Sequence, residues 1–349
     1  MLTVRAPGKL VIFGEYAVLH GAPALVQAVD RYARVSVSEQ AGGDSQLLAR
    51  PLLRQAAMFH FDDEHGFQWQ DALNHQRLPF IAPLMNYLGP WRADGGLELT
   101  LDTGDFFAEY GAERRKLGIG SSAALSVAMT AAWYAYRHDR QSLDRERWLR
   151  PLVELHRRLQ DGRGSGVDVA ASLYGGQIIY TINDEQSPHA VPVAAAPEIE
   201  WMWIWLGQSA STRDFLTTMQ AFAEQRPASY KSLMDRLQDT AQAGREAVDK
   251  ADASELLRQI SAYGEGMRAL GEAAGAPIYT ADHRRLAQLA QRYGVAFKPS
   301  GAGGGDIALI ASQDTAALSS LARQVRTAGY QVVAMAPARH GLSITNRAE

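Results

Sequence analysis

The N-terminal part of the chain contains short strand-like runs separated by small residues. Leu2–Val4 and Lys9–Phe13 predict two short strands joined by a turn, and Pro23–Val37 shows the alternation typical of a longer strand. Downstream we expect a helix over residues 80–88, a strand over 97–101, a helix from 122 to about 137, a helix over 151–159 with its proline in the first turn, and a strand over 177–181. These elements mix both types of secondary structure.

The second part of the chain alternates long helices with strands. Residues 200–207 form a strand-like run with three tryptophans, and a second glycine-rich loop follows Phe297. A helix over 315–328 and strands over 331–335 and 342–344 complete an α+β pattern. Another helix carries a single apolar stripe at spacings of four and three, which predicts core packing. The residues of the stripe are Leu256, Ile260, Tyr263, Met267 and Leu270.

The segment Pro188–Pro197 is rich in proline and alanine and is the expected domain boundary. This boundary predicts an N-terminal domain over residues 1–187 and a C-terminal domain over residues 198–349. With 349 residues, the chain is long enough for two domains.

Composition excludes several classes of protein. Hydrophobic residues make up 46% of the chain and charged residues 21%, as is ordinary for a globular protein. The net charge of -3 argues against nucleic acid as a partner. The absence of cysteine excludes disulfides and thiolate metal sites, and the spacing of His60, His65 and His75 matches no metal-binding pattern. No apolar run is long enough for a bilayer and no signal peptide is recognisable, so we expect a cytoplasmic protein without a membrane partner.

The stretch from Lys116 to Leu125, KLGIGSSAAL, is the first candidate for chemistry. Its glycines let the backbone curl, and a helix beginning near Ser121 adds free N–H groups and a positive dipole end, an arrangement that suits a phosphate. One interpretation is that Ser121 or Ser122 caps the helix, and the other is that a serine hydroxyl turns toward a magnesium ion. A Walker A sequence is absent.

The same loop also fits the dinucleotide fingerprint GxGxxA, with Asp139 at a suitable distance downstream. That fingerprint requires a buried strand before the first glycine, whereas the sequence there is AERRK. A nicotinamide site is therefore the less favoured interpretation.

Two further charged residues stand next to glycine turns. Lys9 follows Pro7–Gly8, and its alternatives are a solvated lysine on an edge strand or an ammonium group aimed into a cleft. Asp168 follows the turn that begins at Gly162, and it either caps the next helix or has a catalytic role.

Three small-residue segments, Pro7–Val18, Leu117–Ala124 and Ser300–Asp306, occur at the start, middle and end of the chain. Together they resemble the three signature motifs of the GHMP kinases, a family of galacto-, homoserine, mevalonate and phosphomevalonate kinases. The resemblance implies a two-domain α+β fold, with an N-terminal domain like ribosomal protein S5 and a ferredoxin-like C-terminal domain. It also implies ATP at the middle loop and phosphoryl transfer to a small acceptor.

Finer matches resemble the phosphomevalonate kinase branch. They are GEYAV at 14–18, the run from His156 through Gln160 to GSGVDVAASLYG, SAST at 209–212 and KPSGAGGGD at 298–306. The sequence departs from that branch at Arg163, Val167 and Ile307, and LHG at 19–21 looks more like mevalonate kinase. These departures leave the identity of the acceptor open.

The resemblance implies a set of site residues. Lys9 and Asp168 are expected to be catalytic, and Ser122 is expected to help bind Mg2+. ATP would be held by Lys116, Gly118, Gly120, Ser121, Ser122 and Ala123. The phosphorylated acceptor would be held by Lys9, Tyr16, His156, Arg163, Ser165, Gly166, Asp168, Ser211, Thr212, Arg213, Lys298, Gly301, Ala302 and Gly303.

Several alternatives stay open at the level of sequence. The acceptor is expected to be phosphomevalonate, with mevalonate or another small alcohol as the alternative. A diphosphomevalonate decarboxylase is less favoured, and so is a catalytically silent homologue that binds ATP or a metabolite. The quaternary structure is expected to be a monomer or a homodimer.

Overall fold

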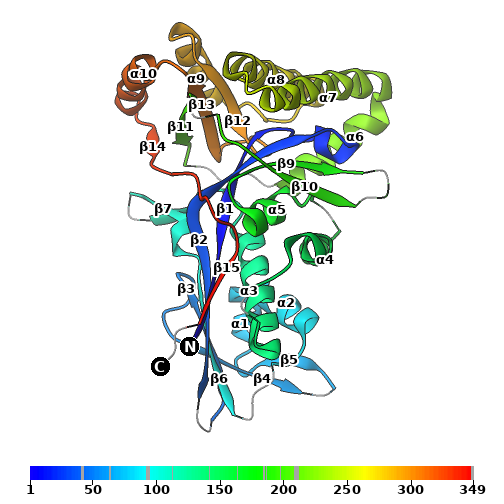
Figure 1. Cartoon of the computed structure of the whole chain (residues 1–349), viewed down its shortest axis with the longest axis vertical. Coiled ribbons are helices and arrows are strands. Elements are labelled where there is room, and N and C mark those ends of the chain that lie inside the picture. The colour runs from blue at the N-terminus through cyan, green and yellow to red at the C-terminus, as the bar shows by residue number, and fades with distance from the viewer. Residues whose placement is uncertain are drawn as a thin grey trace.

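The structure is a computed structural model, shown as ribbons in Figure 1. It describes residues 1–40, 43–62, 64–91, 95–111, 113–140, 142–162, 164–183, 185, 187–196, 198–207 and 212–346, without the side chains of residues 212 and 213. The fold is mixed α+β, as the sequence predicted.

The elements of the first part precede residue 197. Their bounds are β1 Leu2–Phe13, η1 Ala17–His20, β2 Ala24–Gln40, β3 Ser45–Arg50, β4 Ala57–Asp62, β5 Gly66–Trp69, α1 Leu73–Arg77, α2 Ile81–Leu88, β6 Gly96–Asp102, η2 Gly104–Phe106, β7 Phe107–Tyr110, β8 Glu113–Lys116, α3 Ser121–His138, α4 Arg145–Leu159, α5 Val167–Tyr174, β9 Gln177–Ile182 and β10 Pro188–Val193.

The elements of the second part follow residue 197. Their bounds are β11 Glu200–Trp205, α6 Thr212–Gln225, α7 Pro227–Asp249, α8 Ala253–Ala274, α9 Ala281–Arg292, β12 Ala296–Ser300, β13 Ile307–Ser312, α10 Thr315–Thr327, β14 Gln331–Val333 and β15 Ser343–Asn346.

Strand β1 is one continuous strand, so the prediction of two strands over this segment was wrong. It pairs antiparallel with β2, and the register shifts between Pro7 and Gly8. The shift absorbs the turn-like residues without ending the strand. A side chain at Gly8 would approach the carbonyl oxygen of Ile119 to 2.8 Å, so the glycine lets the loop before α3 lie against β1. The Lys9 amide donates to that same carbonyl at 2.9 Å.

Three helices, α3, α4 and α5, pack beside the large sheet that contains β1 and β2 (Figure 1). Helix α3 approaches closely because its buried positions are mostly small, and Ala123, Ala124 and Ala128 are completely buried. Helix α4 begins at Arg145 rather than at Pro151, since the Asp144 side chain accepts hydrogen bonds from the amides of Glu146 and Arg147. The prediction of Pro151 in the first turn was therefore wrong.

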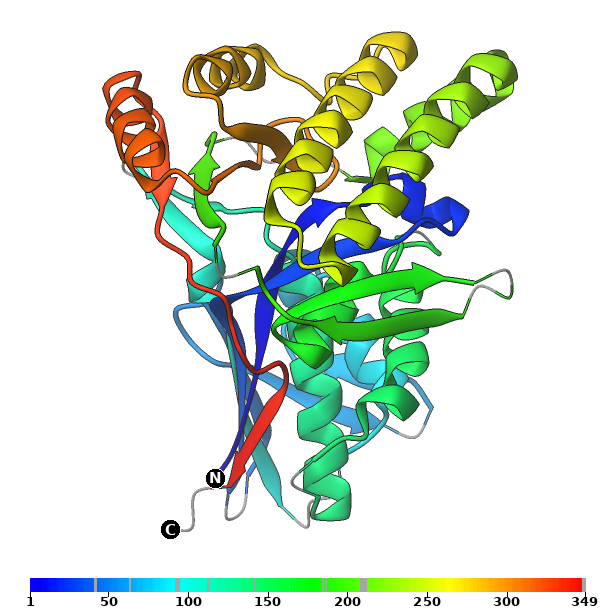
Figure 2. The same ribbon diagram turned by 45° about the horizontal axis from the view of Figure 1, so that its top comes forward.

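The second part contains an antiparallel sheet in the order β12-β13-β11-β14. Helices α8 and α9 contact β12, and α7 lies beside α8 (Figure 2). Trp205 is paired with Ile307 and Lys298 with Leu309, so these four side chains share one face of the sheet. That face meets the first part of the chain, since Lys298 and Ser300 bond to Val11.

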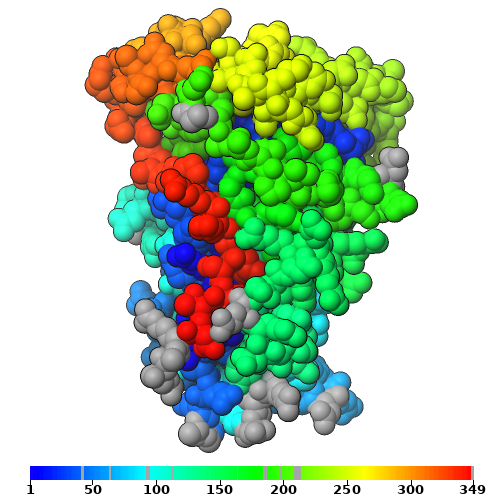
Figure 3. Space-filling model, viewed as in Figure 1, coloured from blue at the N-terminus to red at the C-terminus, as the bar shows by residue number. Residues whose placement is uncertain are grey.

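The expected boundary at Pro188–Pro197 begins with a strand. Its residues 188–193 form β10, which pairs with β9, because prolines are tolerated at the edge of a sheet. Strand β15 returns to pair with β1, and in Figure 3 the C-terminal segment crosses the surface of the first part. The division into residues 1–187 and 198–349 stays a prediction.

Two properties of the described residues bear on the sequence expectations. Among the helices that the structure describes, none is long and apolar enough to cross a membrane. Within the same described ranges, no group of three or more His, Cys, Asp or Glu side chains is arranged to hold a metal ion.

Candidate active site

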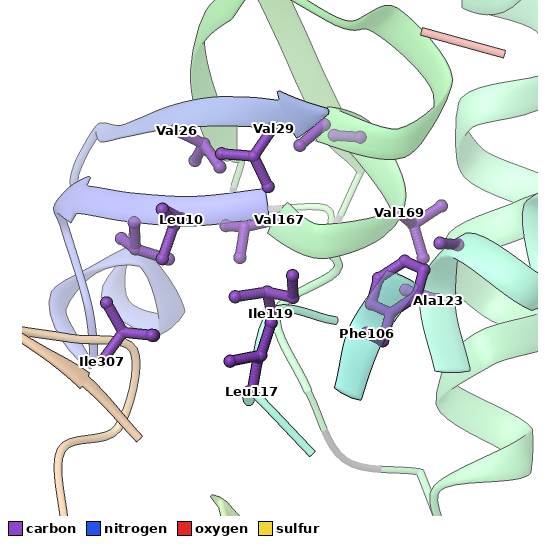
Figure 4. Packing of buried hydrophobic residues seen from close by; sticks show 14 of the residues in the cluster. Leu10, Val26, Val29, Phe106, Leu117, Ile119, Ala123, Val167, Val169 and Ile307 are labelled. Atoms are coloured by element: carbon purple, nitrogen blue, oxygen red, sulfur yellow. The ribbon is translucent and has the colours of Figure 1, made fainter. Parts of the chain in front are cut away.

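The three glycine-containing segments of the sequence meet at one cavity of about 270 Å³. The first segment contributes Lys9 and Tyr16, the middle segment Gly118 to Ser122, and the last Gly301, Ala302 and Asp306. Figure 4 shows buried apolar side chains that pack together around these segments. They include Leu10, Leu117, Ile119, Val167 and Ile307.

The middle loop presents the start of α3 to the cavity. Gly118 and Gly120 have φ angles of 75° and 83°, which only glycine adopts without strain, and Gly120 is the N-cap residue of the helix. No side chain caps this terminus, so the interpretation of Ser121 or Ser122 as the cap was wrong. The first N–H groups of α3 have no acceptor within the helix and remain available to an anion.

The strand before this loop is exposed. Residues Glu113–Lys116 form β8, whose only pairing among the described residues is with β7 in a two-stranded sheet. The dinucleotide fingerprint requires a buried strand at this place. The interpretation of this loop as a nicotinamide site is therefore contradicted, as the sequence AERRK indicated.

Lys9 and Asp168 flank Gly120. A Cβ added to Gly120 would lie 3.4 Å from Cγ of Lys9 and 3.5 Å from Cβ of Asp168. Both side chains are partly buried and line the cavity. The structure thus places an ammonium group and a carboxylate at the helix terminus where an anion is favoured.

Asp168 lies in the first turn of α5, but it does not cap this helix. The N-cap residue is Gly166, with φ 88° and no side-chain cap, and a side chain there would collide with Val153 and Tyr180. The Asp168 carboxylate accepts from the neighbouring amide of Val169 at 3.0 Å. The Asp168 carboxylate therefore lies at the end of α5 where the helix dipole favours a negative charge.

His156 is buried behind the cavity surface, with only 3% of its area exposed. Its Nε2 atom is 3.2 Å from Oγ of Ser122 and 3.2 Å from Nε2 of Gln160. Its Nδ1 atom is 3.9 Å from Oδ1 of Asp168. The expectation of a direct contact between His156 and the acceptor was therefore wrong, since its neighbours Ser122, Gln160 and Asp168 line the cavity instead.

The expectation that Lys298 binds the acceptor was also wrong. Its side chain is completely buried, and Nζ contacts Oε1 of Glu15 at 2.5 Å and the carbonyls of Val11 and Pro299. Burial lowers the pKa of Lys298, and the nearby Glu15 carboxylate opposes that shift. Lys298 is thus occupied by a protein carboxylate and does not reach the cavity.

Tyr16 joins the first and third segments. Its hydroxyl donates to the carbonyl of Ala302 at 2.6 Å, and its φ of 61° is unusual for a residue with a side chain. Burial, helped by the negative charge of Glu15, raises the pKa of Tyr16, which keeps its hydroxyl protonated. Tyr16 therefore forms a wall of the cavity and holds the third loop in place.

The remaining predicted residues divide into three groups. Lys116, Ser121, Ser165, Gly301 and Ala302 line the cavity. Ala123, Gly166 and Gly303 lie behind it and shape the loops, Ala123 being completely buried. Arg163 and Ser211, and the side chains of Thr212 and Arg213, lie outside the described residues.

Among the polar side chains that line the cavity, sequence reasoning gave no role to Glu15, Gln160 and Asp306. Glu15 and Asp306 stand inside the quoted motifs, beside residues that did receive roles. A Cβ on Gly118 would lie 2.2 Å from Cγ of Asp306, so the carboxylate of Asp306 is packed against the middle loop. The only sequence signal for these residues was their position in the motifs.

Several residues of this site lie in a segment that matches a known protein family. The family model described as GHMP kinases N terminal domain matches residues 96–176, which include the middle loop, His156 and Asp168. A phosphomevalonate kinase from Streptomyces sp. (strain CL190) is 29% identical over 97% of this chain and 97% of that protein. The chain is therefore similar to GHMP kinases, within the family model over residues 96–176 and to the Streptomyces protein over nearly its whole length.

Two further GHMP kinases extend the comparison. A mevalonate kinase from Archaeoglobus fulgidus is 28% identical over 87% of this chain and 90% of that protein. The solved structure of Streptococcus pneumoniae phosphomevalonate kinase in complex with phosphomevalonate and AMPPNP has a TM-score of 0.74 and 18% identity, over 97% of this chain and 100% of that one. This last likeness concerns the fold alone.

The family match and the phosphomevalonate kinase relative identify the chain as a phosphotransferase. The two-domain α+β fold predicted from the three motifs, with its S5-like and ferredoxin-like parts, is confirmed. The roles of individual residues in the reaction remain proposals.

Proposed function

We propose that the chain transfers the γ-phosphoryl group of ATP to (R)-5-phosphomevalonate and releases 5-diphosphomevalonate and ADP. The observation that carries this proposal is the pair Lys9 and Asp168, which flanks Gly120 at the uncapped start of α3 inside one cavity. The similarity to the Streptomyces phosphomevalonate kinase over 97% of both chains supports the choice of acceptor.

The middle loop fits the phosphates of ATP. Its glycines have positive φ angles, and the first amides of α3 have no side-chain cap, so they can donate to phosphate oxygens. Ser122 lines the same cavity and offers a hydroxyl oxygen to Mg2+. When bound, Mg2+ supplies positive charge to the phosphates.

The acceptor end of the cavity lies between the first and third segments. Tyr16, Ser165, Gly301 and Ala302 line the cavity, and we assign them to this end, where Lys9 supplies a positive charge. Because Lys298 is paired with Glu15, it is not part of our proposal for the acceptor site. Arg163 and Arg213 remain candidates from the sequence alone.

Phosphoryl transfer mainly requires positioning and charge neutralisation. An oxygen of the acceptor phosphate forms a bond to the γ-phosphorus while the bond from that phosphorus to the bridging oxygen of ADP breaks. A phosphate monoester has a second pKa of about 6, so it needs little deprotonation near neutral pH. We therefore assign Lys9 to the transferred group and Asp168 mainly to the orientation of Lys9 and the acceptor.

Mevalonate is the second candidate acceptor. The similarity to the Archaeoglobus mevalonate kinase favours it, and so does the LHG segment, whose Leu19 lines the cavity. With an alcohol acceptor, Asp168 would have to act as a general base, because a hydroxyl group must lose its proton during transfer.

The test is ADP release with ATP and Mg2+, with (R)-mevalonate and its 5-phosphate compared as acceptors. Turnover with the 5-phosphate alone is expected. Turnover with mevalonate alone would replace our proposal by the second candidate. If neither acceptor gives ADP while ATP still binds, the proposed substrate is wrong and the assignment of the ATP site stands.

A further inference from the structure

His156 lies at the junction of three helices whose termini form the cavity. Ser122 is in the first turn of α3, Asp168 is in the first turn of α5, and His156 and Gln160 are at the end of α4. The imidazole is 97% buried, and two of its neighbours are the residues assigned to Mg2+ and to the acceptor. His156 itself does not line the cavity.

The hydrogen bonds define the tautomer of His156. The Gln160 amide nitrogen can only donate, so Nε2 of His156 must accept from it. A nitrogen that accepts carries no proton, so in this tautomer the Ser122 hydroxyl at 3.2 Å is the donor toward Nε2 and shares the single lone pair of that nitrogen with the Gln160 amide. The proton of the neutral ring is then on Nδ1, the atom 3.9 Å from Oδ1 of Asp168.

This arrangement has a consequence for Ser122. Once the hydroxyl proton is directed to His156, only the lone pairs of Oγ are free on the cavity side, and lone pairs are what a cation takes. We propose that His156 is a positioning residue that turns the Ser122 hydroxyl oxygen toward the magnesium ion of the bound nucleotide.

Gln160 completes the positioning group. Its amide oxygen faces Gly164, where a Cβ would lie 3.3 Å from Oε1, and its amide nitrogen faces His156. The amide nitrogen is the end of Gln160 that meets the imidazole. The His156 ring is thereby held with Nε2 toward α3 and Nδ1 toward α5.

The inference rests on the proposed function, but its test needs no acceptor. The affinity for a non-hydrolysable ATP analogue is measured by calorimetry with and without Mg2+. The ratio of the two dissociation constants gives the increase in affinity that Mg2+ causes, which we call the metal-linked gain. A failure of phosphomevalonate as a substrate would leave this ratio untouched, so the two failures are distinguishable.

Two polar replacements of His156 distinguish the role of its Nε2 atom from that of its Nδ1 atom. In His156→Gln the side-chain amide reaches the position of Nε2 and can accept from Ser122, whereas in His156→Asn it reaches only the position of Nδ1. We expect the metal-linked gain to fall about tenfold in His156→Asn and in Ser122→Ala, and to be largely kept in His156→Gln. Affinity without metal should change little in all three variants. His283→Gln, which removes another buried imidazole on α9, is the matched control and should leave both affinities unchanged.

The double variant His156→Asn/Ser122→Ala should lose no more of the gain than either single variant, because both remove the same interaction. Additive losses would overturn the proposal. So would an unchanged gain in His156→Asn, an unchanged gain in Ser122→Ala, or an equal loss of affinity without metal. Circular dichroism and the melting temperature verify that each variant is folded, and if His156→Asn does not fold, a loss of the gain in folded His156→Gln also overturns the proposal.

Discussion

Nζ of Lys298 lies 2.5 Å from Oε1 of Glu15, and the two side chains are 0% and 4% exposed. This ion pair joins β12 to the segment that follows β1, across 283 residues of sequence. The same carboxylate oxygen accepts from the amide of Gly301 at 3.0 Å, and Gly301 lines the cavity. The buried pair therefore fixes the third glycine loop relative to the first.

Removal of one partner of this pair should be strongly destabilising. In Lys298→Met the Glu15 carboxylate stays buried without its cation, and we expect the free energy of unfolding to fall by about 3–5 kcal/mol in urea titrations. The double variant Glu15→Leu/Lys298→Met removes both charges and should recover part of that loss. Lys231→Met is the matched control, because Lys231 pairs with Asp235 at 2.7 Å on the surface and is 76% exposed. A loss in Lys298→Met no larger than in this control would contradict the prediction.

The middle loop should not tolerate a side chain at Gly120. In Gly120→Ala the positive φ of 83° costs about 1 kcal/mol of stability, and the new Cβ would also press between Lys9 and Asp168. We therefore expect kcat/KM to fall by at least about tenfold, more than the stability change explains. Gly275→Ala is the control, because this residue ends α8 with φ 66° and has nothing within 4 Å of its added Cβ. It should lose similar stability and keep full activity.

Much of the site was predictable because it depends on local backbone chemistry. Glycines before an apolar helix gave the position of the phosphate-type loop at Gly118 and Gly120, and the order of the three motifs indicated that Lys9 and the third loop would join it. The structure brings these segments to one cavity. Most strands and helices follow from alternation and spacing for the same reason.

The errors concern features that depend on tertiary partners. A lysine in a glycine-rich motif looks like an anion ligand, but Lys298 is neutralised by Glu15, whose proximity depends on the docking of β12 onto β1. His156 looks like a substrate ligand until the packing of α4 against α3 and α5 buries it. Likewise, Pro7–Gly8 reads as a turn, and only the bulged pairing with β2 keeps β1 continuous.

Asp168 and Lys9 are predicted to contribute to turnover to different extents. If the acceptor is a phosphate monoester, Asp168→Asn should lower kcat by about 10²-fold at pH 7.5, through loss of orientation, and Lys9→Met should lower it further. Steady-state ADP release measures both values. Full activity of Asp168→Asn would show that its assigned role is wrong. Asp161→Asn, an exposed carboxylate beyond the end of α4, is the control and should stay close to the unmodified protein.

The last prediction concerns the stability of the chain at mildly acidic pH. His283 is completely buried on α9, and its Nε2 atom has no hydrogen-bond partner in the part of the chain that the structure describes. Burial lowers the pKa of this imidazole from 6.5 to about 4. Between these values the unfolded chain binds a proton that the folded chain does not, so stability falls as pH falls through this window and is fully present above it.

From pH 7.5 to pH 5 this group should remove about 2 kcal/mol from the free energy of unfolding. Urea titrations at both pH values should show that loss in the unmodified protein and lack it in His283→Gln, whose amide does not titrate. His189→Gln, at an exposed position on β10, should keep the loss. The same pH dependence in His283→Gln and in the unmodified protein would mean that other groups cause it.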